Sequence, residues 1–168
     1  YTLKIPSKLQ RISDYTFSKC ISLTEIKIPG NIREIGYKSF SGCSGLREIS
    51  IPSTVKTVGI GAFENCTELK DISLPTTLTE INYYTFSGCT SLTTLTLHSK
   101  LTAINNYAFA GCKSLTEIHC KNSNPPLIGE NTFRDVNRIG CKIFVPSKRA
   151  KKSYSTALYW NEFTIYIE

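Results

Sequence analysis

A four-residue signature recurs five times in this chain at a spacing of 23 residues. It reads FSKC, FSGC, FENC, FSGC and FAGC, and begins at Phe17, Phe40, Phe63, Phe86 and Phe109. Aliphatic positions keep the same spacing, as in the column Leu23, Leu46, Leu69, Leu92 and Leu115. A fixed period of about 20–50 residues is typical of solenoids, in which each repeat is one coil that contacts only its neighbours. The sequence therefore predicts a stack of five to six coils around columns of phenylalanine, cysteine and aliphatic residues.

Each unit contains a short alternating segment that ends in proline, such as LTEIKIP at residues 23–29. The alternation predicts a half-buried strand, and proline ends it because proline has no N–H to donate to a ladder. A second extended piece follows, and then a tight helical or 3₁₀ turn that contains the FxxC signature. Equivalent strands of successive coils are expected to stack about 4.8 Å apart and to bury one continuous core. Two positions depart from this pattern, because His98 replaces the repeated proline and Cys120 takes an aliphatic position.

The register changes in the C-terminal part of the chain. Ile128 and Phe133 follow their counterparts by 24 residues, and CKIFVPSK then repeats the strand-then-proline order. Ser147 is suited to cap a helix that runs to about Leu158. The aromatic residues suited to cover the end of the stack are Tyr159, Trp160 and Phe163.

These boundaries predict one solenoid domain over residues 1–168. Its regular 23-residue repeats cover 1–122, and an atypical last repeat with a C-terminal cap covers 123–168. Because Tyr1 enters in the middle of a unit, we expect further repeats or another domain to precede it.

The formal net charge of +7 is concentrated near the C-terminus. Residues 133–168 carry seven basic and three acidic side chains, and the densest run is SKRAKK at 147–152. We interpret this run as a solvated helix face, because it lacks interleaved aromatic residues and any nucleic-acid-binding motif. Contact with an anionic glycan is the alternative. Nucleic acid is not an expected partner, and without an apolar run of about 18 residues a membrane is reached only through an anchor outside this segment.

The cysteines have four possible roles: metal ligands, disulfides, reactive thiols or packing. Zinc sites usually contain cysteine pairs two residues apart, and no such pair occurs here. One cysteine per coil beside a phenylalanine predicts buried, inert thiols. A disulfide near the cap stays open for Cys120 and Cys141.

Catalytic patterns are absent from the sequence. His119 is next to Cys120, but adjacent strand residues face opposite sides and cannot form a nucleophile–base pair. The sequence contains no phosphate-binding glycine loop, no HExxH and no nucleophile elbow. We therefore expect no enzyme activity, no metal site and no cofactor.

The exposed positions of the predicted strands form polar columns, and an extended repeat face is the usual binding surface of a solenoid. Without exposed aromatic residues, this face is expected to recognise a partner by polar groups and shape rather than by stacking sugars. Tyr15, Tyr84 and Tyr107 precede their phenylalanines on the turn side, where core packing and turn-side contact are both open. The candidate ligand-binding residues of the strand face are Glu25, Lys27, Arg47, Glu48, Lys70, Asp71, Thr94, Thr96, Glu117 and His119.

The unit IPSTVKTVGIGAFENCTELKDISLP (Ile51–Pro75) resembles the 23-residue leucine-rich repeat of the BspA-like, or Treponema-type, family. The ending CKIFVPSKRAKKSYSTALYWNEF resembles the terminal unit of Bacteroidetes members of that family. The resemblance implies an α/β solenoid, a right-handed leucine-rich-repeat fold. It also implies surface or secreted proteins, often lipid-anchored, that adhere to host proteins or to other bacteria.

The expected function is therefore a non-catalytic, extracellular interaction or adhesion module of a bacterial surface protein. Its expected partners are host or bacterial surface or matrix proteins, bound through the strand face, with glycans as a further possibility. The expected location is the cell surface, with any signal or lipid anchor outside this fragment. Two alternatives stay open: a structural spacer that presents another domain, and glycan binding through Lys148, Arg149, Lys151 and Lys152.

Overall fold

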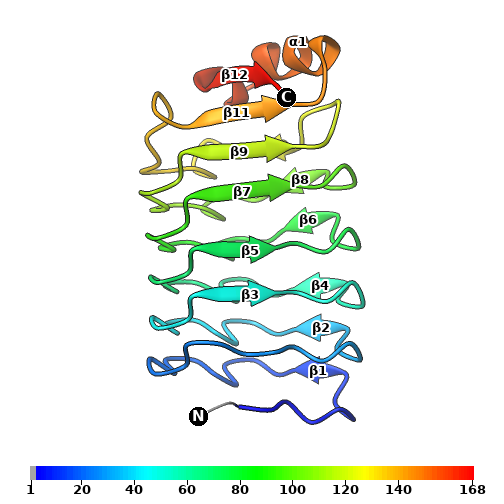
Figure 1. Ribbon diagram of the computed structural model, residues 1–168, viewed down its shortest axis with the longest axis vertical. Coiled ribbons are helices and arrows are strands. Elements are labelled where there is room, and N and C mark those ends of the chain that lie inside the picture. Colours follow the sequence, from blue (N-terminus) through cyan, green and yellow to red (C-terminus); the bar gives the residue numbers. More distant parts are fainter. Residues whose placement is uncertain (1–2) are drawn as a thin grey trace.

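The computed structural model describes residues 3–168 and is a right-handed solenoid of parallel strands (Figure 1). The expectation about how the chain enters at Tyr1 lies outside the described residues. The front row of strands comprises β3 (Glu48–Ser50), β5 (Asp71–Ser73), β7 (Thr94–Leu97), β9 (Glu117–Cys120), β11 (Lys142–Val145) and β12 (Thr164–Ile167). The back row comprises β1 (Arg11–Ile12), β2 (Glu34–Ile35), β4 (Thr57–Val58), β6 (Glu80–Ile81), β8 (Ala103–Ile104) and β10 (Leu127–Ile128).

Strand pairing follows the 23-residue period through the regular coils. In the front row Ile49 lies opposite Ile72 and Leu95 lies opposite Ile118, so aliphatic residues stack on aliphatic residues. The exposed and buried positions alternate along these strands, as in β3 and β5. The repeat predicted from the sequence is therefore the structural coil.

A column of phenylalanine rings runs through the interior of the stack. From Phe17 to Phe133, consecutive ring centroids lie 5.1, 5.2, 5.4, 5.4 and 5.6 Å apart, and the rings are nearly parallel. The thiols form a second column, and four of them donate to the carbonyl of a phenylalanine in the preceding coil: Cys43, Cys66, Cys89 and Cys112. The Cys43 Sγ lies 3.0 Å from the Phe17 oxygen, and the Cys66 Sγ lies 3.3 Å from the Phe40 oxygen. Cysteine thus fills a small apolar site and adds a second hydrogen bond to a carbonyl that already accepts from a backbone N–H.

Two expectations about the regular coils need adjustment. Cys20 is exposed rather than packed, because among the described residues no coil precedes it to cover its side chain. The turn that carries FxxC contains short hydrogen-bonded turns, such as Cys20 N to Phe17 O at 3.1 Å, instead of a helix. The helical content of the described chain lies in the C-terminal cap.

The two departures from the repeat leave its backbone unchanged. The carbonyl of His98 accepts from the N–H of Leu101 at 3.2 Å, as the carbonyl of Pro75 accepts from that of Leu78 at 3.1 Å. Cys120 lies opposite Leu97 in the paired strands and is fully buried. Both residues therefore occupy ordinary positions of the coil.

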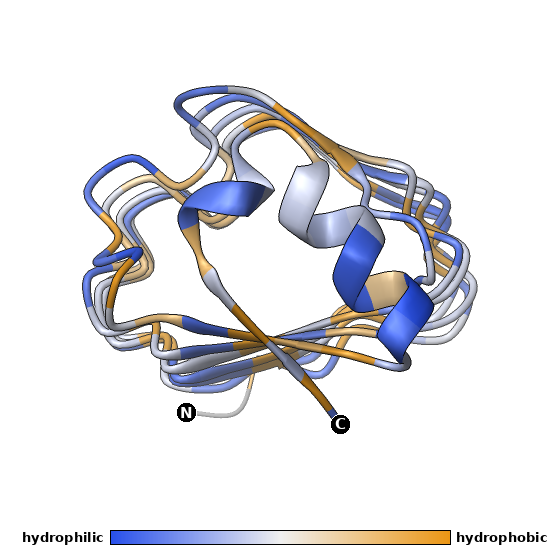
Figure 2. Ribbon diagram, turned by 90° about the horizontal axis from the view of Figure 1, so that it is seen from above, coloured by the Kyte–Doolittle hydropathy of each residue, from blue (hydrophilic) through white to orange (hydrophobic). Residues whose placement is uncertain are grey.

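The C-terminal unit closes the upper end of the stack, as Figure 2 shows from above. The Ser147 Oγ accepts from the N–H of Ala150 at 3.1 Å and caps α1 (Lys148–Thr156). The helix ends at Thr156, two residues before the expected end, because Ala157 is already extended. The short 3₁₀ helix η1 (Trp160–Glu162) then places Trp160 under the helix, where its ring meets Tyr154 edge-on at 5.2 Å.

The C-terminal unit also buries Phe133, the last ring of the stacked phenylalanine column. The rings of Trp160 and Phe163 lie 5.8 and 5.6 Å from that of Phe133. The indole Nε1 donates to the carbonyl of Pro126 at 2.8 Å, which satisfies its single donor inside the core. The expected aromatic cover is confirmed for Trp160 and Phe163, whereas Tyr159 is only half-buried.

The strand face as candidate binding surface

The strand face is the solvent-exposed side of the front row. The register places Glu48 opposite Asp71 and Thr94 opposite Glu117, so the expected first column exists. A second column begins with Lys27, whose backbone pairs with that of Lys4 in an isolated parallel β-bridge. It continues through the strand pairs Ser50–Ser73 and Thr96–His119. Arg47 and Lys70 are exposed just before their strands begin and flank these columns.

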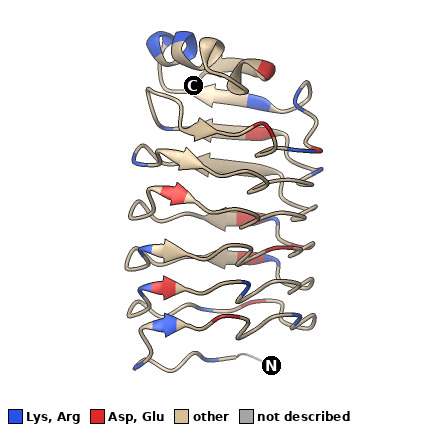
Figure 3. Cartoon of the chain, turned by 180° about the vertical axis from the view of Figure 1, so that it is seen from behind, with Lys and Arg blue, Asp and Glu red and all other residues tan. Residues whose placement is uncertain are grey.

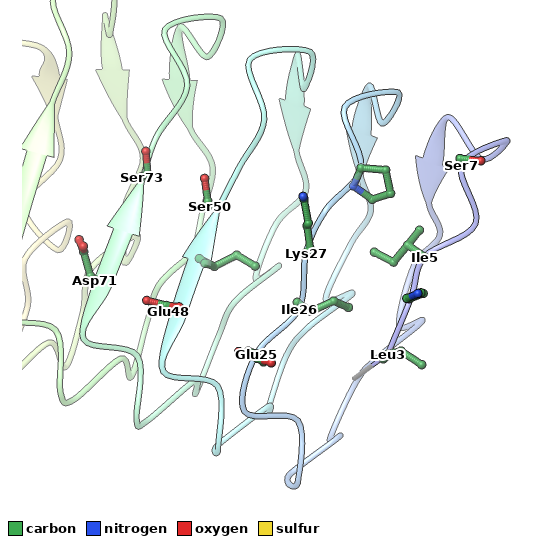
Figure 4. Close-up of a pocket in the computed structure, with 13 residues that line it drawn as sticks. Leu3, Ile5, Ser7, Glu25, Ile26, Lys27, Glu48, Ser50, Asp71 and Ser73 are labelled. Carbon is green, nitrogen blue, oxygen red and sulfur yellow. The ribbon is translucent and has the colours of Figure 1, made fainter. Parts of the chain in front are cut away.

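The N-terminal half of this face contains an open hollow of about 740 Å³. Figure 4 shows Glu25, Glu48 and Asp71 along one row and Lys27, Ser50 and Ser73 along the next. Apolar side chains also line the hollow, including the largely buried Ile26 and Ile49. Four of the ten candidate residues line it: Glu25, Lys27, Glu48 and Asp71.

The N-terminal lining of the hollow was not predicted from the sequence. Leu3, Ile5, Ser7 and Pro29 contribute to it from the first coils. They share the repeat spacing with core or turn positions, so spacing alone gave no reason to treat them as surface groups. The hollow combines an apolar floor with a charged rim.

The carboxylates of the rim form no close ion pair within the described chain, although Lys4 and Lys27 also line the hollow. Among residues 3–168, Glu25, Glu48 and Asp71 form no ion pair within 4.0 Å. Stacked parallel strands place such side chains about 4.8 Å apart, and like charges that lie opposite each other are destabilising. A cationic group bound at this rim relieves that repulsion.

The comparisons with known proteins agree with this geometry. The BspA type leucine rich repeat region matches residues 1–116 and 33–161, with six copies. The chain belongs to this family. The BspA-type family and fold are typically non-catalytic. No protein with a curated description matches the chain.

Solved structures give the same fold. A leucine rich cell surface protein from Faecalibacterium prausnitzii is 26% identical, with a TM-score of 0.69, over 93% of this chain and 51% of that protein. A leucine rich repeat protein from T. pallidum is 28% identical, with a TM-score of 0.66, over 70% of this chain and 57% of that protein. One from Bacteroides ovatus is 24% identical, with a TM-score of 0.62, over 98% of this chain and 54% of that protein. The BspA-type chain thus spans about half the length of the solved proteins that it matches.

At the C-terminal end of the strand face, several charges are engaged within the chain. The His119 Nδ1 lies 2.7 Å from the Glu168 Oε1, and the Lys121 Nζ lies 2.6 Å from the Glu168 Oε2. The hydrogen bonds from Lys121 and His119 lower the pKa of Glu168. His119 also lies 3.5 Å from Glu117. Two candidate residues, Glu117 and His119, therefore contact the C-terminal residue of this BspA-type chain or each other, rather than standing alone.

The expectation that the strand face lacks exposed aromatic residues is wrong. Phe144 lies opposite His119 and Tyr166 lies opposite Phe144, with ring centroids 4.9 and 5.6 Å apart. Tyr166 is 40% exposed, and the Lys142 Nζ lies 6.0 Å from its ring centre. Phe144 follows His119 by 25 residues and Tyr166 follows Phe144 by 22, so a period of 23 cannot align them.

The six buried thiols lie in the interior, away from this surface. Burial raises the pKa of Cys43 to about 11 and that of Cys112 to about 12. Cys120 and Cys141 are free in the structure, and burial raises the pKa of each to about 12. Within residues 3–168 no three metal-ligating side chains converge, and no helix in that range is long and apolar enough to cross a membrane.

The turn-side tyrosines are not core residues. Tyr15 and Tyr84 are 55% and 38% exposed, and Tyr107 is half-buried. Tyr84 and Tyr107 stack with parallel rings 4.9 Å apart, and Tyr15 meets Tyr37 edge-on at 5.2 Å. Of the two alternatives for these residues, the structure favours turn-side contact.

Proposed function

We propose that this chain is a non-catalytic interaction module of a bacterial cell-surface protein, and that its strand face binds host or bacterial surface or matrix proteins. The observation that carries the proposal is the hollow with an apolar floor and three unpaired carboxylates on its rim. Buried apolar contact supplies most of the free energy of protein association, and complementary charge supplies specificity and association rate. A basic peptide segment or loop fits both features.

The surface location is supported by one neighbour, which is described as a leucine rich cell surface protein. A structural spacer needs only a polar, soluble face. A spacer role does not explain why Glu25, Glu48 and Asp71 lie without ion-pair partners around an apolar floor. The hollow therefore favours binding over a purely structural role.

The test compares two variants that have the same change in net charge. E25K/E48K/D71K reverses the rim of the hollow, and the control reverses three exposed carboxylates off this surface, E68K/E80K/E130K. The fluorescently labelled proteins are incubated with intact bacteria and with epithelial cells, before and after the cells are treated with protease. Bound protein is measured by flow cytometry.

We expect the unmodified chain and the control to bind in a protease-sensitive manner. The rim variant is expected to lose about tenfold in affinity, which corresponds to about 1.4 kcal/mol. Equal binding by both variants would rule out the strand face as the contact surface. Binding that survives protease treatment would argue against a protein partner.

A second candidate is anionic glycan binding by the cap, supported by the basic residues of α1. Lys148, Arg149, Lys151 and Lys152 are all exposed, and within the described chain none forms an ion pair. In Figure 3 the helix at the C-terminal end of the stack carries the colour of Lys and Arg. This candidate predicts retention on heparin that falls steeply with salt and is lost when the four residues are changed to glutamine.

A further inference from the structure

A second surface lies along the edge where each back strand enters its turn. It consists of Tyr15, Tyr37, Ile60, Tyr83, Tyr84 and Tyr107, which we name the turn-edge strip. The first five of these side chains are 37–55% exposed. Figure 3 shows the back strands that lead into these turns. The strip lies beside the back row of strands, so its ligand is not the partner proposed for the strand face.

The backbone of the strip holds tyrosine in a conformation that favours glycine. Tyr15, Tyr84 and Tyr107 have φ angles of 57°, 58° and 63°, and Gly61 occupies the same position of its coil with φ 63°. A left-handed conformation costs free energy for any residue with a Cβ, and glycine avoids that cost. The fold therefore accepts glycine here, and the exposed rings add little to the core. Because these rings are not needed to fill the core, they are available to contact a ligand outside the chain.

The rings are held in place before any ligand arrives. The parallel pair Tyr84–Tyr107 and the edge-on pair Tyr15–Tyr37 each join two successive coils. Backbone bonds fix these coils at the same positions, with Tyr15 N to Tyr37 O at 2.9 Å and Gly61 N to Tyr83 O at 3.0 Å. Rigid aromatic groups lose little conformational entropy on binding.

The strip is electrically neutral. The two residue columns that form it span five coils and contain two charged residues, Asp14 and Lys38. Asp14 is paired with Arg11 at 2.8 Å, and Lys38 is paired with Glu64 at 3.1 Å. No free charge of these columns is therefore available to attract a charged protein or a nucleic acid.

We propose that the turn-edge strip binds a neutral polysaccharide, whose sugar rings lie against the tyrosine rings. A pyranose presents C–H bonds with slight positive charge, which complement the negative face of an aromatic ring. Among the described residues Tyr83 is 45% exposed and stacks on no other ring, whereas the stacked and edge-on pairs mainly offer ring edges and hydroxyls for hydrogen bonds to the sugar. The coils repeat about every 4.8 Å along one direction, so the strip offers successive contacts to a linear polymer. The third coil contributes Ile60 and Gly61 instead of tyrosines, so a polymer along the strip contacts Tyr15 and Tyr37 on one side of this coil and Tyr83, Tyr84 and Tyr107 on the other.

The test is affinity electrophoresis in gels that contain dextran, mannan, laminarin or xylan. The first variant is Y84G/Y107G, which removes two rings and also their backbone strain. The second is Y37A/Y83A, at positions with ordinary backbone angles, in case the glycine variant does not fold. The matched control is Y166A, which removes a similarly exposed tyrosine from the strand face.

We expect at least one of the four neutral polymers to retard the unmodified chain and Y166A equally. Both strip variants are expected to bind that polymer at least about tenfold more weakly, and Y84G/Y107G is expected to keep its Tm within about 4 °C because released strain offsets lost ring contact. The rim variant E25K/E48K/D71K keeps full retardation, so this test is independent of the strand-face proposal.

Three results would overturn the proposal. The first is that none of the four polymers retards the unmodified chain. The second is that folded strip variants are retarded as strongly as the unmodified chain. The third is that the strip variants lose only the protease-sensitive binding to cells, which would make the strip a protein contact.

Discussion

His98 occupies the position that proline occupies in four other coils. Replacing it with proline tests whether this coil has the same backbone conformation as the others. Leu97 is extended, as a residue before proline must be, and the His98 carbonyl already makes the bond that Pro75 makes. Within residues 3–168 the His98 N–H donates to no main-chain carbonyl, so proline removes no backbone bond there. The substitution H98P is therefore compatible with the coil.

The expected gain in stability has two sources. A proline in a compatible position stabilises by about 0.4–1 kcal/mol, because it restricts the unfolded chain. The buried His98 Nε2 has no hydrogen-bond partner, and such a group costs about 1–3 kcal/mol. The loss of the bond from Lys100 N to the His98 Nδ1, at 3.3 Å, offsets part of this gain. We expect H98P to be about 1–2 kcal/mol more stable at pH 7.5, which raises Tm by about 2–8 °C.

The difference is expected to grow as the pH falls. Burial lowers the pKa of His98 in the folded chain and the positive charge of Lys100 lowers it further, while the backbone of Pro75 opposes part of this shift. In the unfolded chain histidine takes up a proton below about pH 6.5, whereas the folded chain resists protonation. The contribution of neutral His98 to the free energy of unfolding is therefore complete above that pH. It is lost as the pH falls through the pKa that His98 has in the folded chain. H98P has no such loss.

The measurement is urea denaturation of both proteins between pH 7.5 and pH 5, with H98Q as the control. H98Q removes the titrating group without adding proline, so its advantage over the unmodified chain is expected to appear only at low pH. A variant H98P that is less stable at pH 7.5 would refute the inferred equivalence with proline. A stability difference that stays constant across the pH range would refute the assignment of His98 as the titrating group.

Three further predictions concern the core and the cap. F63A is expected to lose about 3–5 kcal/mol in the free energy of unfolding by urea, because Phe63 is fully buried between two stacked rings. Under native conditions at pH 8, Ellman's reagent is expected to modify Cys20 rapidly and the six buried thiols only after unfolding; fast reaction of several thiols would contradict the packing of the column. W160F leaves the Pro126 carbonyl without its donor and is expected to lose about 1–3 kcal/mol by calorimetry, and an unchanged Tm would show that this bond does not stabilise the cap.

The regular coils could be predicted from the sequence because their contacts repeat with the chain. A side chain that stacks on its equivalent in the next coil must recur at the same spacing. The spacing of Phe40 and Phe63 therefore predicts from the sequence alone that both lie in the interior. The exposed column through Glu48 and Asp71 followed from the same argument. The irregular strands beyond residue 122 could not be aligned in this way.

Several contacts around the candidate site do not follow the repeat spacing and could not be predicted from it. The contact between His119 and Glu168 joins residues 49 positions apart, and the stack of Phe144 on His119 uses a spacing of 25. The exposure of Cys20 depends on whether a coil lies beneath it, which its own FxxC signature does not reveal. Each of these features belongs to an end of the stack, where the periodic contact is lost.

The sequence by itself determined the family, the coil, the packed columns and the polar character of the strands. These follow from a period, and a period fixes which residues meet when identical coils stack. Only the tertiary structure decided which carboxylates remain unpaired, where the apolar floor is open to solvent, and which tyrosines stand outside the core. Those properties depend on the distances between side chains of different coils and on the cover that the ends receive, and no spacing along the chain encodes them.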